Sequence, residues 1–263
     1  MTRLVVALLL ALTPSLAQDP AVIFDEANTF FQRANRLQSN DPEAARGLYQ
    51  RAILRYERLI SESGIHNGKL HYNLGNAYFQ MDDIGRAILN YRKAERLNPS
   101  DSNVSQTLDF ARTRRYDKFE DAQQTQVLRT LLFWHFDLPP STRLGIFTVL
   151  SLVFWGAMIL RLLGRFTIPG GALAGLGIVA ALFLGSIVYD AAVGEKQRHG
   201  VVTAPDVVAR MGDGETYEPS FTDPLHAGAE VRLLEQRPDW YQVELPDGRR
   251  CWLPSRDVEL INQ

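Results

Sequence analysis

The chain has 263 residues and a formal net charge of −2, with the average composition of a globular protein. This charge balance excludes the concentrated basic field that nucleic-acid-binding proteins show, so no nucleic-acid partner is expected. The single cysteine, Cys251, excludes an intramolecular disulfide and a metal cage built from cysteines. The average conceals an asymmetry, because the apolar residues are concentrated in one part of the chain.

Residues 1–17 predict a secretory signal peptide. Arg3 gives a short positive start, and the apolar run Leu4–Leu12 is too short to span a bilayer. Ser15 and Ala17 are the small residues expected before a cleavage site. A short buried helix is the alternative. If the signal is cleaved, the following residues emerge outside the cytoplasmic membrane.

Residues 20–120 show a helical pattern that contains a repeat. The diagnostic positions are Leu74, Gly75, Tyr78, Ala87, Tyr91, Ala94 and Pro99. Their spacing resembles the tetratricopeptide repeat (TPR), a pair of antiparallel helices with a period of ~34 residues. We expect Gly75 and Ala87 to lie where the helices cross, and Tyr78 and Tyr91 to fill the space between them.

An earlier, looser repeat and a final helix extend this domain. The earlier repeat is marked by Phe24, Ala27 and Phe30 in its first helix and by Ala45, Tyr49 and Ala52 in its second. A last helix from Ser102 to Lys118 would cap the stack. The sequence therefore predicts an N-terminal α-helical TPR solenoid over residues 20–120.

Stacked helix pairs of this kind present a concave surface that binds peptide segments. We expect this TPR groove to be lined by Asn28, Lys69, Tyr72, Asn73, Asn76, Phe79 and Gln80. The alternative is that these side chains only solvate or pad the stack. Asn28 and Asn73 fall at the asparagine positions of a TPR subtype that grips a C-terminal carboxylate. Because the cation positions of that subtype hold Phe24, Asn103 and Thr107, a groove for a mixed apolar and polar segment is expected instead.

Two long uncharged runs predict a transmembrane hairpin over residues 143–190, with helices at 144–163 and 168–189. Core helices of a soluble protein are the alternative, but they nearly always keep a polar stripe, and neither run has one. The second helix contains two pairs of small residues, each with three residues between its members. The pairs are Gly171 with Gly175 and Ala181 with Gly185. Such pairs favour close helix packing in lipid, either against the first helix or against another membrane protein.

Arginines at the ends of the first apolar run suggest an orientation. Arg143 and Arg161 bracket it, and both can extend toward lipid headgroups. Arg161 and Arg165 lie in the short turn at Gly164, and short cytoplasmic loops are enriched in arginine. Together with the signal peptide, this places the turn in the cytoplasm and both flanking domains outside it.

The juxtamembrane segment, residues 121–142, is apolar and aromatic. Its apolar side chains are Leu128, Leu131, Leu132, Trp134 and Phe136. This composition suits a helix at the membrane interface, where aromatic residues are enriched. Packing against the TPR stack is the alternative.

Residues 200–263 predict short strands, with Val231, Leu233, Tyr241, Val243 and Leu245 on one face. The segments "HAGAEV", "DWYQV" and "GRRCWLP" make this region similar to bacterial SH3-like barrels, with Cys251 at a usual glycine position. Such barrels bind peptides or cell-wall glycopeptide through aromatic side chains. The candidates are Tyr217, Phe221, Trp240, Tyr241 and Trp252, of which at least two must fill the barrel core.

Motifs for chemistry are lacking in the sequence. The five histidines form no metal-ligand spacing, and no HExxH, P-loop or GxSxG motif occurs. Cys251 has no histidine base nearby in the sequence. We therefore expect no catalytic residue, no metal and no cofactor, and a protein that is not an enzyme.

The order of signal peptide, TPR, hairpin and SH3-like barrel, together with "FARTRRYDKFE" after the TPR, resembles the BatE-type proteins of bacterial aerotolerance (Bat) operons. That resemblance implies partners with von Willebrand factor A domains in the membrane and, indirectly, a MoxR-type ATPase. The expected function is a membrane-anchored adaptor on the extracytoplasmic side of the cytoplasmic membrane, in contact with lipid. The alternative is a protein that binds or senses peptidoglycan through the barrel.

Overall fold

A computed structural model describes residues 19–119, 131–136, 138–194 and 198–262 of the chain. The described chain forms two compact units, the first ending at Ile65 and the second beginning at His66. The expected signal peptide lies outside the described residues, as does the first part of the juxtamembrane segment, including Leu128.

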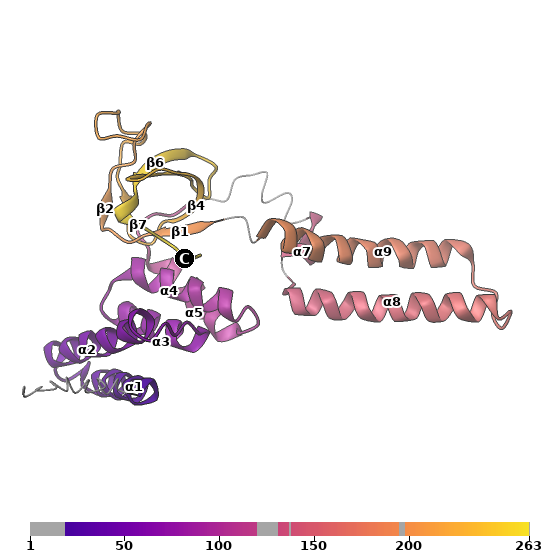
Figure 1. The fold of residues 1–263 in the computed structure, drawn as a ribbon, viewed down its shortest axis with the longest axis horizontal. Coiled ribbons are helices and arrows are strands. Elements are labelled where there is room, and N and C mark those ends of the chain that lie inside the picture. The colour runs from indigo at the N-terminus through magenta and orange to yellow at the C-terminus, as the bar shows by residue number, and fades with distance from the viewer. Residues whose placement is uncertain (1–18, 120–130, 137, 195–197, 263) are drawn as a thin grey trace, which may run out of the picture. The chain divides into compact units, whose positions relative to one another are not determined.

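The first unit is a pair of helices, α1 (Pro20–Leu37) and α2 (Pro42–Ser61), which lie side by side in Figure 1. A proline opens each helix, and an aspartate, Asp19 or Asp41, caps it by accepting a backbone N–H. Ring contacts of Phe24 with Tyr56 and of Phe31 with Tyr49 show that the helices run antiparallel.

The second unit begins with α3 (Gly68–Gln80), α4 (Ile84–Leu97) and α5 (Ser102–Arg114). The expected roles of the repeat residues are confirmed. A Cβ on Gly75 would lie 2.8 Å from the Tyr91 ring, so only glycine permits this crossing, and Tyr78, Ala87 and Tyr91 are buried.

The helix α5 ends at Arg114, earlier than the expected end at Lys118. Arg115 has extended backbone angles instead of helical ones. The extended chain lets the Asp117 carboxylate accept hydrogen bonds from the backbone N–H of His226, at 2.7 Å, and pair with its ring. A contact distant in sequence thus overrides the local helical tendency.

The apolar runs form α8 (Pro140–Leu162) and α9 (Gly170–Tyr189), followed by a π-helical turn η1 (Asp190–Gly194). Both helices are long and apolar enough to cross a membrane. Only 6% of the most apolar stretch of α8 and 17% of that of α9 is buried. A core helix would be mostly buried. The turn at Gly164 has a φ of 67°, with N–H groups of Gly164 and Arg165 closing onto carbonyls of Arg161 and Leu160.

The glycine pairs of α9 do not contact α8. Hypothetical Cβ atoms on Gly171, Gly175 and Gly185 would meet nothing within 4 Å, whereas one on Gly177 would contact Phe154 at 3.4 Å. Packing of these pair glycines against the first helix is therefore wrong, because α9 turns the face of Gly177 toward α8.

The sequence predicted that Arg143 extends toward lipid headgroups. This prediction is wrong, because Arg143 is buried, with 3% of its surface exposed. Its guanidinium donates to the Ser186 hydroxyl at 2.6 Å and to the Asp190 carboxylate at 2.5 Å. His135, in the short helix α7 (Phe133–Phe136), contacts both Ser186 and Arg143. Asp190, which follows α9, forms an ion pair with Arg143. The contacts of His135 with Ser186 and Arg143 hold α7 against the hairpin.

The C-terminal region, residues 198–262 (the sheet domain), is built of short antiparallel strands (Figure 1). A five-stranded sheet has the order β6-β5-β4-β1-β7, and β2 pairs with β3. The strands are β1 (His199–Val202), β2 (Asp206–Val207), β3 (Leu225–His226), β4 (Glu230–Gln236), β5 (Trp240–Glu244), β6 (Arg250–Pro254) and β7 (Val258–Leu260), with a 3-10 turn η2 (Ser255–Asp257) before β7.

The core of the sheet domain confirms the expected facing. Val231, Tyr241, Val243 and Leu245 are buried in one cluster, and Leu233 packs against it. The hairpin of β5 and β6 aligns Trp240 with Pro254. Closure of this sheet into an SH3-like barrel stays a prediction.

A pair of glycine substitutions tests the helix crossing in the repeat. Gly75→Ala should destabilise the protein by about 1–3 kcal/mol, because the new methyl overpacks against Tyr91. The matched change Gly47→Ala in α2 meets open space and should stabilise by about 0.5–1 kcal/mol through helix propensity. Thermal unfolding followed by circular dichroism measures both, and equal effects of the two would contradict the crossing.

Candidate functional site

The expected groove residues of the second unit all lie on α3, but two of them, Tyr72 and Asn76, are engaged in packing. The Tyr72 hydroxyl lies 3.3 Å from the Thr107 hydroxyl on α5, and the Tyr72 ring is 5.9 Å from that of Tyr91. Asn76 accepts a hydrogen bond of 2.8 Å from the Tyr91 hydroxyl. These side chains fix α3 against α4 and α5.

An aromatic pair forms the apolar part of this surface. Phe79 lies 5.7 Å from Phe110 of α5, ring centre to ring centre, and Phe110 is 55% exposed. Lys69 and Gln80 are also exposed, and Asn73 is half-buried. Phe110 was missed in the sequence analysis, although α5 occupies the place of the next repeat's first helix and so presents its own residues there.

Asn28 belongs to the first unit, where it accepts a hydrogen bond of 2.8 Å from the Tyr56 hydroxyl of α2. Its side chain therefore links α1 to α2. The structure assembles the other six groove residues on one helix, and their role in binding stays a prediction.

The five candidate aromatics of the sheet domain are not equally accessible. Tyr241 belongs to the buried core cluster and Phe221 packs against it, in line with the expectation that at least two fill the core, whereas Trp252 is buried outside this cluster. Trp240 and Phe221 are half-buried, and only Tyr217 is exposed. Two guanidinium groups lie over ring faces: Arg249 is 4.3 Å from the Phe221 centroid and Arg237 is 4.6 Å from that of Trp252.

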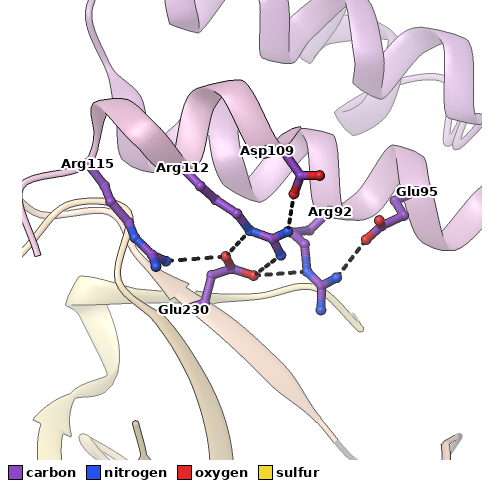
Figure 2. A network of polar contacts seen from close by, with 6 residues as sticks. All are labelled: Arg92, Glu95, Asp109, Arg112, Arg115 and Glu230. Carbon is purple, nitrogen blue, oxygen red and sulfur yellow. Dashed lines mark hydrogen bonds and ion pairs between the residues drawn. The ribbon is translucent and has the colours of Figure 1, made fainter. Parts of the chain in front are cut away.

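A network of polar contacts joins the TPR helices of the second unit to the sheet domain, and the sequence analysis did not find it (Figure 2). Glu230, at the start of β4, receives both nitrogens of the Arg112 fork at 2.7 and 3.0 Å. Arg92 of α4 lies 3.2 Å from it and Arg115 lies 3.6 Å away. Asp109 pairs with Arg112 at 2.8 Å and Glu95 pairs with Arg92 at 2.6 Å, as Figure 2 shows.

The electrostatics of this network favour the charged carboxylate. Burial raises the pKa of Glu230, but the hydrogen bonds and charge of Arg112 and the charges of Arg92 and Arg115 outweigh it, so the pKa of Glu230 lies below its usual value. The pKa of Arg112 is raised in turn, because the contacts with Glu230 and Asp109 exceed the cost of burial. The three arginines together stabilise one negative charge on a largely buried side chain, which is 16% exposed.

Close backbone packing accompanies this ion network. A Cβ on Gly85 of α4 would lie 2.9 Å from the Val202 carbonyl of β1 and 3.1 Å from Ala227. Gly228, with a φ of 94°, approaches Ile88 of α4 in the same way. The helices and the sheet domain therefore meet through matched small residues as well as charge.

The described residues contain no cluster of metal ligands, and their one cysteine is buried. No group of three or more His, Cys, Asp and Glu side chains in them could hold a metal ion. Burial raises the pKa of the Cys251 thiol to about 12, so this buried side chain is a neutral thiol at physiological pH.

Comparison with known proteins supports the repeat. The family model of the tetratricopeptide repeat matches residues 68–101, the segment of α3 and α4. No curated protein matches the chain. Because this family mediates contacts between proteins, the repeat indicates a protein-interaction scaffold.

The Glu230 network makes the stability of the second unit depend on pH. A carboxyl group whose folded pKa is lowered stabilises the fold above its unfolded pKa of ~4.3, and that contribution is lost as the pH falls through the folded value. Glu230→Gln should therefore reduce the loss of thermal stability between pH 6 and pH 3. Glu230→Ala should cost about 1–3 kcal/mol at pH 7, since three partly buried arginines lose the carboxylate that they share, although Arg112 and Arg92 keep Asp109 and Glu95.

Glu215→Gln is the matched control. The Glu215 carboxylate is exposed, and its ion pair with Arg256 is long, at 4.0 Å. Unfolding of the wild type and both variants by circular dichroism over this pH range separates the two effects. Equal pH profiles for Glu230→Gln and the wild type would contradict the role of the buried carboxylate.

Proposed function

We propose that the protein is a membrane-anchored scaffold that binds other proteins through its TPR helices and its sheet domain. One observation carries this proposal: a tetratricopeptide repeat joined through a buried ion network to a second small domain, in a chain with two apolar helices. Confining two binding modules to one membrane raises their effective concentration for partners on it. No enzymatic activity is proposed.

The proposed location is the bacterial cytoplasmic membrane, with the TPR and sheet domains outside the cytoplasm. The N-terminal sequence with its signal-like order and the arginines at the turn between α8 and α9 support this orientation. The partners proposed from the family resemblance are membrane proteins with von Willebrand factor A domains, connected to a MoxR-type ATPase and to stress tolerance.

Binding of peptidoglycan by the sheet domain is the competing function. It requires aromatic faces that sugar rings can stack on, and four of the five candidate aromatics are buried or half-buried. This distribution favours the scaffold. Retention of the full chain on isolated sacculi, abolished by Tyr217→Ala, would instead favour the wall.

The exposed ring of Phe110 tests the groove. In the tagged full-length protein, purified in mild detergent, Phe110→Ala should reduce the recovery of co-purified partner proteins about tenfold, because interface hot spots are often aromatic. The fold should persist, since more than half of the Phe110 side chain is exposed. Tyr72→Ala is unsuitable for this test, because Tyr72 packs against Tyr91.

Leu97→Ala is the matched control, as Leu97 is a similarly exposed apolar side chain at the end of α4. Mass spectrometry of the bound proteins gives the readout. Equal recovery of partners by Phe110→Ala and Leu97→Ala would contradict binding at this surface, and recovery of the wild-type protein alone would contradict the scaffold itself.

A further inference from the structure

A cavity of about 620 Å³ lies between the TPR helices of the second unit and the sheet domain. Its lining includes the charged side chains of Asp82, Asp83, Arg86, Arg114, Arg115 and Arg256, together with aromatic and apolar residues. None of the expected groove residues or sheet aromatics belongs to this set. The cavity is of a size that accepts a small ligand or a few residues of a peptide.

The charge of the lining is positive, with four arginines and two aspartates, although the whole chain has a net charge of −2. One of the aspartates is already engaged. Asp83 caps α4 by accepting from the Arg86 backbone at 3.0 Å, and it pairs with the Arg86 guanidinium at 3.1 Å. The cavity therefore keeps an excess of cations.

Two of these arginines, Arg114 and Arg256, have exposed side chains and no close ion pair with a described residue. Arg114, in the last turn of α5, is exposed and forms no ion pair with any residue that the structure describes. Arg256 is 76% exposed at its side chain, and its nearest carboxylates, Asp257 and Glu215, lie 3.8 and 4.0 Å away. By contrast, Arg112 and Arg92, outside the cavity, share Glu230 at 2.7 to 3.2 Å.

An aromatic and apolar wall stands beside the cations. Tyr116 lies against the His226 imidazole, with ring centres 4.1 Å apart, and Asp117 fixes His226 through both its backbone and its ring nitrogen. Ala204 and Pro205 continue this wall. A ligand that uses the whole cavity must carry negative charge next to apolar groups.

We infer that this cavity binds an acidic segment of a partner protein, with carboxylates at Arg114 and Arg256 and a neighbouring apolar side chain on the wall of Ala204 and Pro205. The guanidinium fork matches the two oxygens of a carboxylate. A bare phosphate would leave the apolar wall unused and would meet Asp82 and Asp83 with its higher charge. The inference rests on the proposed function in one respect, that the partner is a protein.

Fluorescence anisotropy of a labelled hexapeptide of alternating glutamate and leucine, titrated with the full-length protein in a neutral detergent, tests this site. We expect saturable binding that weakens with added salt. Arg114→Ala with Arg256→Ala should weaken it about tenfold, because each ion pair at an exposed side chain is worth roughly threefold in affinity. Neither substitution removes a buried contact, so the fold is expected to persist.

Arg33→Ala with Arg51→Ala is the matched control, since both side chains are exposed on the first unit and their loss changes the net charge equally. A glutamine–leucine hexapeptide controls for the carboxylates, and competition by inorganic pyrophosphate tests the phosphate alternative. Absence of binding, equal affinity of the two double variants, or displacement by pyrophosphate more effective than by unlabelled peptide would each overturn the inference.

These outcomes are separate from the fate of the scaffold. In one outcome, partner recovery depends on Phe110, but the affinity for the hexapeptide does not depend on Arg114 and Arg256. That outcome would contradict the cavity as a binding site and support the scaffold. In the other outcome, the hexapeptide binds at the cavity, but the wild-type chain recovers no partner protein. That outcome would contradict the scaffold and support the cavity as a binding site.

Discussion

The buried carboxylate of Glu230 is the contact on which the arrangement of the second unit depends. A single negative charge at the start of β4 is shared by arginines from α4, from α5 and from the segment after α5. Desolvation alone would expel such a charge, and the arginines would be as costly without it. The network therefore stabilises the fold only while the helices and the sheet domain stay together. Small residues at Gly85 and Gly228 supply the close approach that makes these ion pairs short.

This joint changes how a two-module scaffold works. Modules on a loose linker sample many relative positions, and each partner then meets one module at a time. Modules packed into one compact unit present their surfaces next to each other. The same packing creates a surface that neither module has alone, the cation-rich cavity between the start of α4 and the loops of the sheet domain. Partner recognition can then depend on the junction as well as on the exposed face of α3 and α5.

Local sequence patterns predicted the helices and strands. They did not predict contacts between residues that are distant in the sequence. The repeat was recognisable because Gly75 and Tyr91 encode a helix crossing through their spacing, and the hairpin because its runs lack charge altogether. Arg112 and Glu230 are 118 residues apart and follow no periodicity, so nothing in the sequence pairs them. Arg143 illustrates the same limit, since its expected extension toward headgroups is replaced by a contact with Asp190. Six of the seven expected groove residues lie on α3, but the hydroxyl and amide contacts of Tyr72 and Asn76 depend on α4 and α5.

The most direct measurement is the distance distribution between spin labels on Gln106→Cys in α5 and Asp239→Cys before β5, by double electron–electron resonance. Both positions are exposed, and the native Cys251 is buried and stays unlabelled in the folded protein. The account predicts one narrow distribution for the otherwise native chain and a broad one after Glu230→Ala. A broad distribution in the native background, or a narrow one that Glu230→Ala leaves unchanged, would contradict the claim that the buried carboxylate holds the two modules together.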